Sequence, residues 1–229
     1  MAASTKLAIS LTHVEYTEGD RVGYLLAWSS LFPIFILISF LTLVAIRRDL
    51  FTVFFFTGLL LNESLNMFLK YTIKEPRPNS DISSAVLRVE YGMPSSHAQF
   101  MAFFATFVTL LLFVRATLSE DIKDLLYKVI VSVGAWGGAI LCAISRVYLG
   151  YHTISQTIYG NLVGVLSALI WFSIVHFLVT PYFPKIYYWR LNDFLMFKDF
   201  SLIPNCLWYE YTAVRHESRT RLKRKSMHE

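Results

Sequence analysis

Three short segments of the sequence carry residue types that suit chemistry on a phosphate. Lys70 and Arg77 supply two cations, the run Pro94–His97 ends in a histidine, and Arg146 precedes a second histidine, His152. A transferring phosphoryl group passes through a transition state rich in negative charge, which asks a protein for positioned cations and oriented N–H donors. A histidine beside such a group can act as nucleophile or proton donor. The segments therefore indicate phosphoryl transfer, provided that the fold brings them together.

The first segment lies at the end of an apolar stretch. Lys70 and Arg77 are seven residues apart, so they lie along one face if a helix continues through both. Pro76 and Pro78 argue against that continuation, because each proline favours extended geometry in the residue before it. They also stiffen the chain, which can fix the guanidinium of Arg77 at the membrane surface. The competing interpretation is that the two cations simply extend to water from a helix end.

The second segment predicts the start of a helix. Pro94 suits a first helical turn, and the hydroxyl groups of Ser95 and Ser96 can satisfy the free N–H groups there. Amides at a helix N-terminus form an anion site, and His97 would reach a phosphate bound in it. Taken alone, the segment is equally typical of a capped helix with an interfacial histidine.

The third segment joins two apolar stretches. Arg146 and His152 are six residues apart, which places them on opposed faces of an unbroken helix, but Gly150 can supply a break that lets them converge. Gln156 follows His152 by four residues, so in a helix the two side chains are neighbours and can hydrogen-bond. The alternative is an arginine extending to water and a histidine in the aromatic belt.

Membrane helices are the elements predicted to position these segments. Of 229 residues, 55% are hydrophobic and 16% charged, the reverse of a soluble domain. A spanning helix needs about 20 mainly apolar residues. Five stretches qualify, 23–46, 50–69, 97–117, 127–146 and 157–179. We therefore expect an all-α fold, a polytopic membrane helical bundle with about five transmembrane helices and the bilayer as its partner.

The second stretch contains polar residues at membrane depth, which is costly unless they face protein or water. These residues are Asn62, Glu63, Ser64 and Asn66, and they make the stretch a functional candidate. Glu63 precedes Lys70 by seven residues. It is either an acidic partner for the chemistry or, as we prefer, one half of an internal ion pair.

The distribution of basic residues predicts the orientation. Five spans place the loops 71–96 and 147–156 on the side of the N-terminus. Seven of the 21 Lys and Arg residues fall there, and the other fourteen fall opposite; the seven are Lys6, Arg21, Lys70, Lys74, Arg77, Arg88 and Arg146. Because cytoplasmic segments are enriched in Lys and Arg, the C-terminal tail is expected in the cytoplasm and the three motifs on the luminal or exterior face.

Composition also narrows the possible partners. The net charge of +5 is attributed to this bias, so no nucleic acid partner is expected. Cys142 and Cys206 are expected to be inert. The polar residues 1–21 contain no cleavable signal peptide, so the first span directs insertion. We expect no metal site and no cofactor, because the nearby carboxylates show no ligand spacing with either histidine; these are Glu63, Glu75, Asp81 and Glu90.

Together the motifs resemble a known family. Lys70-x6-Arg77-Pro78, Pro94-Ser95-Ser96-His97 and Ser145-Arg146-x5-His152 are similar to the three signatures of the type 2 phosphatidic acid phosphatase superfamily. The likeness extends from about Leu11 to Tyr211. Four stretches are further similar to those members that act on dolichyl diphosphate, and these are Glu75–Pro78, Tyr91–His97, Ser145–Leu149 and Ser201–Asn205.

The resemblance implies a metal-independent mechanism through a phosphohistidine. His152 attacks phosphorus, His97 protonates the leaving group, and water hydrolyses the intermediate. The implied phosphate-binding residues are Lys70, Arg77, Ser95, Ser96 and Arg146, of which Arg146 is also assigned a catalytic role. The implied substrate is a polyprenyl diphosphate, hydrolysed at the endoplasmic reticulum membrane with the active site facing the lumen, which recycles the lipid carrier for protein N-glycosylation.

Two positions depart from the general signature. Ser96 stands where glycine is usual, a mild change because its backbone N–H can still donate to phosphate. Gln156 stands where aspartate is usual. An amide can orient His152 but cannot stabilise its cationic form, so a weaker nucleophile is expected. We hypothesise that a diphosphate tolerates this, because its leaving group is a weakly basic phosphate monoester.

The sequence predicts one membrane phosphatase domain over residues 1–229. Its expected parts are a luminal segment 1–21, a transmembrane core 23–179, an interfacial segment 180–211 and a basic cytoplasmic tail 212–229. Two alternatives stay open at this stage. One is a phosphomonoesterase of the same superfamily acting on a lipid or a sugar phosphate. The other is a non-enzymatic anion or lipid transporter whose pathway is lined by Glu63, Lys70 and Arg146.

Overall fold

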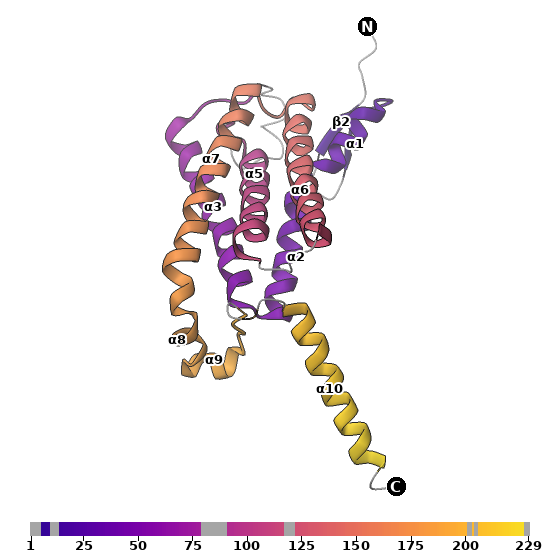
Figure 1. Cartoon of the computed structure of the whole chain (residues 1–229). Coiled ribbons are helices and arrows are strands. Elements are labelled where there is room, and N and C mark those ends of the chain that lie inside the picture. Colours follow the sequence, from indigo (N-terminus) through magenta and orange to yellow (C-terminus); the bar gives the residue numbers. More distant parts are fainter. Residues whose placement is uncertain are drawn as a thin grey trace.

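The computed structural model describes residues 6–9, 14–78, 91–116, 122–200, 203 and 206–226. A two-stranded antiparallel sheet near the N-terminus precedes a bundle of long helices (Figure 1). The strands are β1 (Lys6–Ile9) and β2 (Val14–Thr17), and the helices are α1 (Arg21–Ser29), α2 (Phe32–Arg47), α3 (Leu50–Ile73), α5 (Ser96–Leu110), α6 (Ile122–Tyr148), α7 (Ile154–Ser173), α8 (Phe183–Tyr187), α9 (Arg190–Leu195) and α10 (Cys206–Ser226).

The predicted membrane bundle is confirmed. Within the described residues, five helical stretches are long and apolar enough to cross a membrane, namely Arg21–Arg47, Leu50–Ile73, Ser96–Arg115, Ile122–Tyr148 and Ile154–Tyr187. Many large apolar side chains on these helices are exposed, including Leu25, Ile130 and Leu166. An exposed apolar surface of this extent is what a lipid environment accommodates.

The observed spans differ from the predicted bounds by up to eight residues, and the first and last spans also differ in form. The first is two helices, because Pro33 near the start of α2 has no N–H to donate back to the preceding turn. The hydroxyl groups of Ser29 and Ser30 bond instead to the carbonyl of Leu26, at 2.7 and 3.5 Å. The last span contains a π-helical segment over Ile174–Val179 and runs eight residues past the predicted end at 179, through a 3₁₀ turn and α8 to Tyr187.

Helix α5 lies at the centre of the bundle and packs against α2, α3, α6 and α7. Its inner face carries Phe103 and Phe107, which are buried among aromatic rings from neighbouring helices. The ring of Phe107 stacks on Phe55 of α3 with centroids 4.0 Å apart and meets Phe172 of α7 edge-on at 5.3 Å. This aromatic core fixes the position of α5, whose N-terminus carries Ser95, Ser96 and His97.

A buried polar chain joins α3, α5 and α7 inside the bundle. The side-chain amide of Gln99 donates to Asn62 Oδ1 at 3.0 Å and accepts from Asn66 at 2.8 Å. Asn66 also donates to the carbonyl of Pro94 at 3.3 Å, and Ser167 donates to Asn62 at 2.9 Å. Because unpaired polar groups are costly in a bilayer, these bonds specify how the three helices pack.

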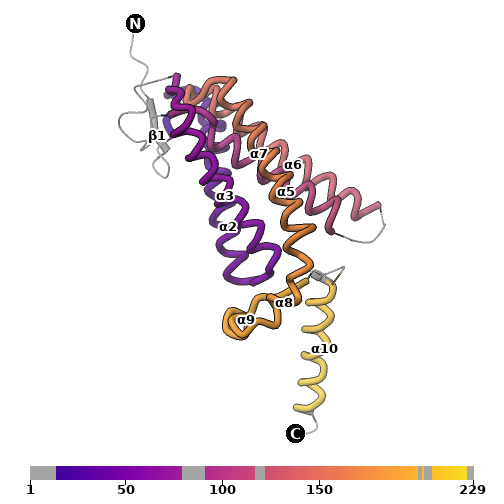
Figure 2. Tube along the Cα trace, turned by 90° about the vertical axis from the view of Figure 1, so that its left-hand side faces the viewer, coloured from indigo at the N-terminus to yellow at the C-terminus, as the bar shows by residue number. Residues whose placement is uncertain are grey.

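The C-terminal part of the chain lies at the far end of the bundle. Helix α8 forms the end of the last span, α9 follows it at the same end of the bundle, and α10 projects away from the bundle (Figures 1 and 2). Backbone bonds between Lys198 and the turn joining α2 to α3, at 2.7 and 3.0 Å, fasten this region. Helix α10 runs through the boundary predicted between an interfacial segment and a tail at 211, and its last turn carries Lys223, Arg224 and Lys225.

Candidate active site

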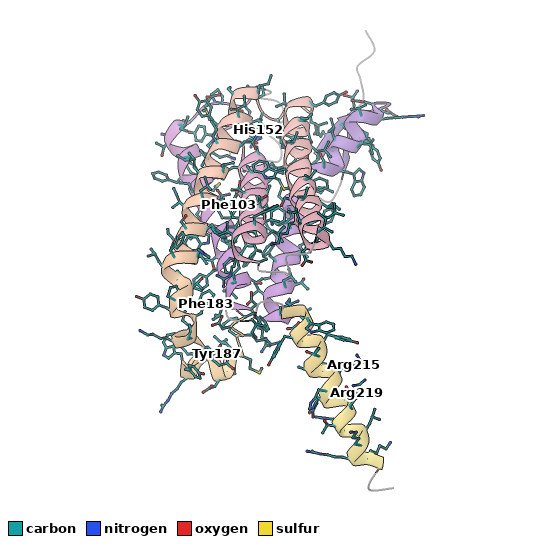
Figure 3. All side chains as sticks on the ribbon, viewed as in Figure 1. Phe103, His152, Phe183, Tyr187, Arg215 and Arg219 are labelled. Carbon is teal, nitrogen blue, oxygen red and sulfur yellow. The ribbon has the colours of Figure 1, made fainter. Side chains whose placement is uncertain are left out.

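The three motif-bearing segments meet at the end of the bundle opposite α8 and α9, where Figure 3 labels His152. The backbone N–H of Ser95 donates to the carbonyl of Gln156 at 3.1 Å, which joins the start of α5 to the first turn of α7. The backbone N–H of Gly92 donates to the carbonyl of Glu75 at 2.7 Å, which joins the chain before α5 to the end of α3.

The turn between α6 and α7 brings His152 back beside Arg146. Gly150 adopts a φ of 74°, a conformation that glycine reaches without strain. The carbonyl of Arg146 then accepts from the backbone N–H groups of Tyr151 and His152, at 3.0 and 3.1 Å. The predicted break at Gly150 is therefore confirmed, and it is what allows the two side chains to converge.

His152 and Gln156 are hydrogen-bonded, but not along a helix face as expected. His152 lies outside α7, whose N-cap is Thr153. The Thr153 side chain accepts from the backbone N–H of Gln156 at 3.2 Å, and Gln156 Oε1 accepts from the backbone N–H of Thr153 at 3.3 Å. This capping box turns the Gln156 amide toward His152, and the His152 Nδ1 to Gln156 Oε1 distance is 3.2 Å.

Three cations, two of them buried, lie around the histidine. The exposed fractions of Lys70 and Arg146 are 3% and 4%, and Arg77 is half-buried. Helix α3 ends at Ile73, so Lys70 and Arg77 do not share a helix face. Even so, the charges of Lys70, Arg77 and Arg146 all act on His152. None of the three forms an ion pair with a carboxylate among the described residues.

Several hydrogen-bonding atoms of this cluster are buried without a partner in the described structure. They are Nε and one terminal nitrogen of Arg77, Nε of Arg146, and Oγ of Ser95. Burying such groups unpaired is costly, so their gathering at one point indicates a site for an anion with several acceptor oxygens. A phosphate group has that character.

The start of α5 differs in one respect from the prediction. Ser95 is the N-cap, but its hydroxyl group makes no capping hydrogen bond, and its N–H is taken by Gln156. The prediction that this serine satisfies the free amides is therefore wrong. The first-turn N–H groups of Ser96 and His97 have no partner within the helix, which leaves them as the donors of an anion site.

His97 also borders a small apolar cavity. The cavity has a volume of about 200 Å³ and is lined by residues of α2, α3 and α5: Pro33, Ile34, Leu37, Leu59, Leu60, Glu63, Ser96, His97 and Phe100. His97 interacts electrostatically with His152 and with all three cations. It therefore lies between the cationic cluster and an apolar space within the bundle.

The electrostatics favour a neutral His152. Burial, followed by the positive charges of Arg146, Arg77 and Lys70, lowers the pKa of this histidine well below 6.5, and the bond to Gln156 opposes the shift only in part. A neutral imidazole keeps a lone pair on one ring nitrogen, which is the form that a nucleophile requires.

Two residues of the site were not singled out for a role from the sequence. Glu75 was considered only as a possible metal ligand, yet its carboxylate accepts from the Gln156 amide at 2.8 Å. Tyr151 places its ring 4.0 Å from the guanidinium of Arg146, and its hydroxyl group accepts from the backbone N–H of Glu15 beside it at 2.8 Å. Glu75 lies 81 residues from Gln156 in the chain, and Tyr151 lies 136 residues from Glu15. No rule on local spacing predicts contacts at such separations.

Of the carboxylates considered as metal ligands, Glu63 and Glu75 lie among the described residues. Among the described residues, no group of three or more His, Cys, Asp or Glu side chains is arranged to hold a metal ion. Asp81 and Glu90 lie outside the described residues. Glu63 and Lys70 interact electrostatically, but the described side chains form no direct ion pair between them.

Comparison with known proteins now decides the family. Residues 51–179, more than half of the chain, match the PAP2 superfamily. The chain belongs to the PAP2 superfamily. This agrees with the resemblance of its three motifs, and it makes the protein a membrane phosphatase.

Relatives within the PAP2 superfamily extend the match to nearly the whole chain. Dolichyldiphosphatase 1 of Mus musculus is 46% identical over 94% of this chain and 91% of its own length. The Homo sapiens protein of the same name is 45% identical over the same shares. Lipid phosphate phosphatase gamma of Arabidopsis thaliana is 38% identical over 91% of each chain.

A solved PAP2 structure shares the fold. The transmembrane PAP2 type phosphatidylglycerolphosphate phosphatase from Bacillus subtilis aligns with a TM-score of 0.55 and 19% identity. The alignment covers 70% of this chain and 80% of that one. At this identity the comparison supports the helical arrangement alone.

Proposed function

We propose that the protein removes the terminal phosphate of a polyprenyl diphosphate, converting dolichyl diphosphate to dolichyl phosphate and inorganic phosphate. The observation that carries the proposal is the set of buried, unpaired donors on Arg77, Arg146 and Ser95 around a neutral His152. The names of the relatives that match more than nine-tenths of the chain support the choice of substrate.

The proposed reaction has two steps, the formation of a phosphohistidine and its hydrolysis. Nε2 of His152 attacks the terminal phosphorus while the bond from phosphorus to the bridging oxygen breaks, and His97 gives its proton to that oxygen. A water molecule then attacks the phosphohistidine, His97 takes a proton from it, and phosphate leaves. Lys70, Arg77, Arg146, Ser95 and the N–H group of Ser96 would hold the phosphoryl oxygens throughout.

Glu75 and Pro76 support this assignment of the ring nitrogens. They accept both hydrogens of the Gln156 Nε2 group, at 2.8 and 2.9 Å. Gln156 Oε1 must therefore face His152, and an amide oxygen only accepts. The hydrogen lies on Nδ1 of His152, and the lone pair lies on Nε2.

The cavity beside His97 supports a lipid leaving group. The leaving oxygen must lie next to the proton donor, and the space of about 200 Å³ that borders His97 is lined mostly by apolar side chains. An isoprenoid unit next to the diphosphate matches that lining. A soluble sugar phosphate would desolvate its hydroxyl groups there without partners.

A luminal site in the endoplasmic reticulum membrane is part of the proposal. The cationic cluster lies at the opposite end of the bundle from the basic helix α10 (Figure 3), and the excess of Lys and Arg on the latter side favours the cytoplasm. Dolichyl phosphate released there would return the carrier lipid to protein N-glycosylation.

Phosphoenzyme trapping tests the mechanism. Purified protein is mixed with dolichyl diphosphate carrying ³²P in its terminal phosphate and quenched within milliseconds. We expect an acid-labile protein label that is absent in His152→Ala and present in the control His176→Ala, because His176 belongs to the distal end of the last span. Turnover without any label, or a label that persists in His152→Ala, would contradict the mechanism.

Steady-state phosphate release distinguishes the remaining candidate functions. A matched series of dolichyl diphosphate, dolichyl phosphate, phosphatidate and a sugar phosphate reports substrate class by kcat/KM. A carrier of anions or lipids would bind these compounds without releasing phosphate.

A further inference from the structure

We propose that Glu75 is a positioning residue for the nucleophile: acting through the Gln156 amide, its carboxylate fixes the His152 tautomer and supports the positive charge that the ring gains on attack. The inference deepens the proposed function and rests on it for its kinetic consequence. It goes beyond the motif, in which an acidic side chain is expected at position 156 itself.

The hydrogen-bond geometry leaves one arrangement for the Gln156 amide. Its Nε2 group lies 2.8 Å from Glu75 Oε1 and 2.9 Å from the carbonyl of Pro76, both of which only accept. Its Oε1 lies 3.3 Å from the donating N–H of Thr153. Reversing the amide would replace three good bonds with three repulsive contacts, so Glu75, together with Pro76 and Thr153, determines which atom His152 meets.

The surroundings of His152 are otherwise positive. Arg146, Arg77 and Lys70 act on the ring from α6, from the chain after α3 and from α3 itself, and His97 faces it from α5. Among the described residues hydrogen-bonded to Gln156, only Glu75 is charged. Attack on phosphorus makes the imidazole cationic, and a carboxylate one amide away stabilises that charge by polarising the amide between them.

The chain around Glu75 is built to hold this contact. The carbonyl of Glu75 accepts from Gly92 at 2.7 Å, and Pro76 pairs with Tyr91 as in an antiparallel ladder. A Cβ atom at Gly92 would lie 2.7 Å from Gln156 Oε1. The amide is therefore enclosed between the two strands of chain and the start of α7.

The decisive variant is Glu75→Gln, which keeps the shape and the acceptor oxygen but removes the charge. We expect the phosphoenzyme to form about tenfold to a hundredfold more slowly, with substrate KM little changed. The acid limb of the kcat/KM profile should move to lower pH, because losing a negative charge disfavours protonated His152. Glu217→Gln, on the exposed face of α10, is the matched control and should leave both readouts unchanged.

Exchanging the side chains of Glu75 and Gln156 directly tests the relay, by which we mean the action of Glu75 on His152 through residue 156. Gln156→Glu alone places two carboxylates next to each other and should slow the formation of the phosphoenzyme. In the double variant Glu75→Gln/Gln156→Glu, the amide and the carboxylate exchange positions. The new amide at position 75 can donate to the new carboxylate at position 156, which accepts from His152. We expect the double variant to label at least about tenfold faster than Gln156→Glu, a coupling that a purely structural role does not produce.

A measurement that needs no turnover tests the role of Glu75 independently of the proposed hydrolysis. ¹⁵N-histidine spectra, assigned with His152→Ala, should show His152 as the Nδ1–H tautomer in the wild type, with its titration shifted to lower pH in Glu75→Gln. An Nε2–H tautomer in the wild type, or a titration that Glu75→Gln does not move, would overturn the relay.

The combined results assign any failure. If the wild type is not labelled but the spectra respond to Glu75→Gln, the proposed function fails and the relay stands. If the wild type is labelled and Glu75→Gln alters neither labelling nor the acid limb, the relay fails alone. If Glu75→Gln melts far below the wild type, the double variant Glu75→Gln/Gln156→Glu decides. Recovery of its labelling rate supports the role of Glu75. A double variant that melts like the wild type but does not recover the labelling rate overturns it.

Discussion

The Ser95 hydroxyl group is buried at the start of α5 and has no hydrogen-bond partner among the described residues. A serine used only for capping would bond to its own helix, which Ser95 does not do. Its neighbour Ser96 begins α5 and contributes a backbone N–H that does not depend on the side chain. The two serines of the motif should therefore respond differently to replacement.

Ser95→Ala should lower kcat/KM for the diphosphate by roughly tenfold to a hundredfold, since a hydrogen bond to a charged group contributes about 1.5–3 kcal/mol. It should not lower the melting temperature, because no existing bond is lost. Ser96→Ala keeps the N–H and serves as the comparison, with an effect several-fold smaller. Equal losses in the two variants, or a lower melting temperature in Ser95→Ala, would argue against a role in holding phosphate.

The depressed pKa of His152 predicts how stability depends on pH. The unfolded chain takes up a proton on this residue as the pH falls through about 6.5, whereas the folded protein resists protonation to lower pH. Stability from this source is therefore present above pH 6.5 and is lost as the pH falls toward the folded pKa. Melting temperatures in detergent at pH 7.5 and 5.5 should differ less for His152→Gln than for the wild type; an unchanged difference would contradict the assignment.

Residue types and spacing anticipated much of the site, but not how its parts connect. Lys70, Arg77, His97, Arg146 and His152 were predicted to converge, and the structure brings them together. Glu75 was missed because its partner lies 81 residues away. The contact of His152 with Gln156 was expected for the wrong reason: it arises from the capping box of α7, which a four-residue spacing does not reveal.

At the scale of elements, α5 and α7 pack closely against each other. Gly160 and Gly164 of α7 face α5, and a Cβ atom at Gly160 would lie 2.7 Å from the carbonyl of Ser95. A Cβ atom at Gly164 would collide with the carbonyl of Gln99. Small residues spaced by four let membrane helices approach this closely, and here they set the distance between the start of α5 and the capping turn of α7.

Gly164→Ala should separate α5 from α7 and lower the free energy of unfolding by about 1–3 kcal/mol, the usual range for overpacking. Activity should fall with it, since Gln99 belongs to the polar chain that holds Pro94. Gly137→Ala on α6 is the matched control: nothing lies within 4 Å of a Cβ there, so a helix-favouring alanine should be neutral or stabilising. Thermal melting in detergent measures both, and equal melting temperatures would sink the packing argument.

The spans were predictable from length and apolar content, whereas their interruptions were not. Pro33 is a sequence signal for the break between α1 and α2, but the local bonds of the serine hydroxyl groups, and Ser145 of α6 donating to Leu26 at 2.7 Å, are seen only in the structure. The two strands near the N-terminus were also not predicted. β2 packs against α1, and its residues meet Tyr151 across the sequence, so its role becomes visible only in three dimensions.

For the whole molecule, the five candidate spans among the described residues predict that the two ends of the chain lie on opposite sides of the membrane. A spaced glycosylation tag added before Met1 should be modified in microsomes, and the same tag after Glu229 should not. An endoglycosidase shift on gels reads the result. Modification of the C-terminal tag alone would reverse the proposed orientation, and modification of both would contradict an odd number of crossings.

The capping turn at the start of α7 has a consequence for how the protein is made. Through Gln156 it bonds to the segment after α3, to the start of α5 and to His152, and it begins the last of the described spans to leave the ribosome. A nascent chain with four spans in the bilayer already holds Lys70, Arg77 and His97, but the orienting amide has not yet been synthesised. If Gln156 orients His152 as proposed, hydrolysis is expected to begin only when synthesis of the bundle is nearly complete.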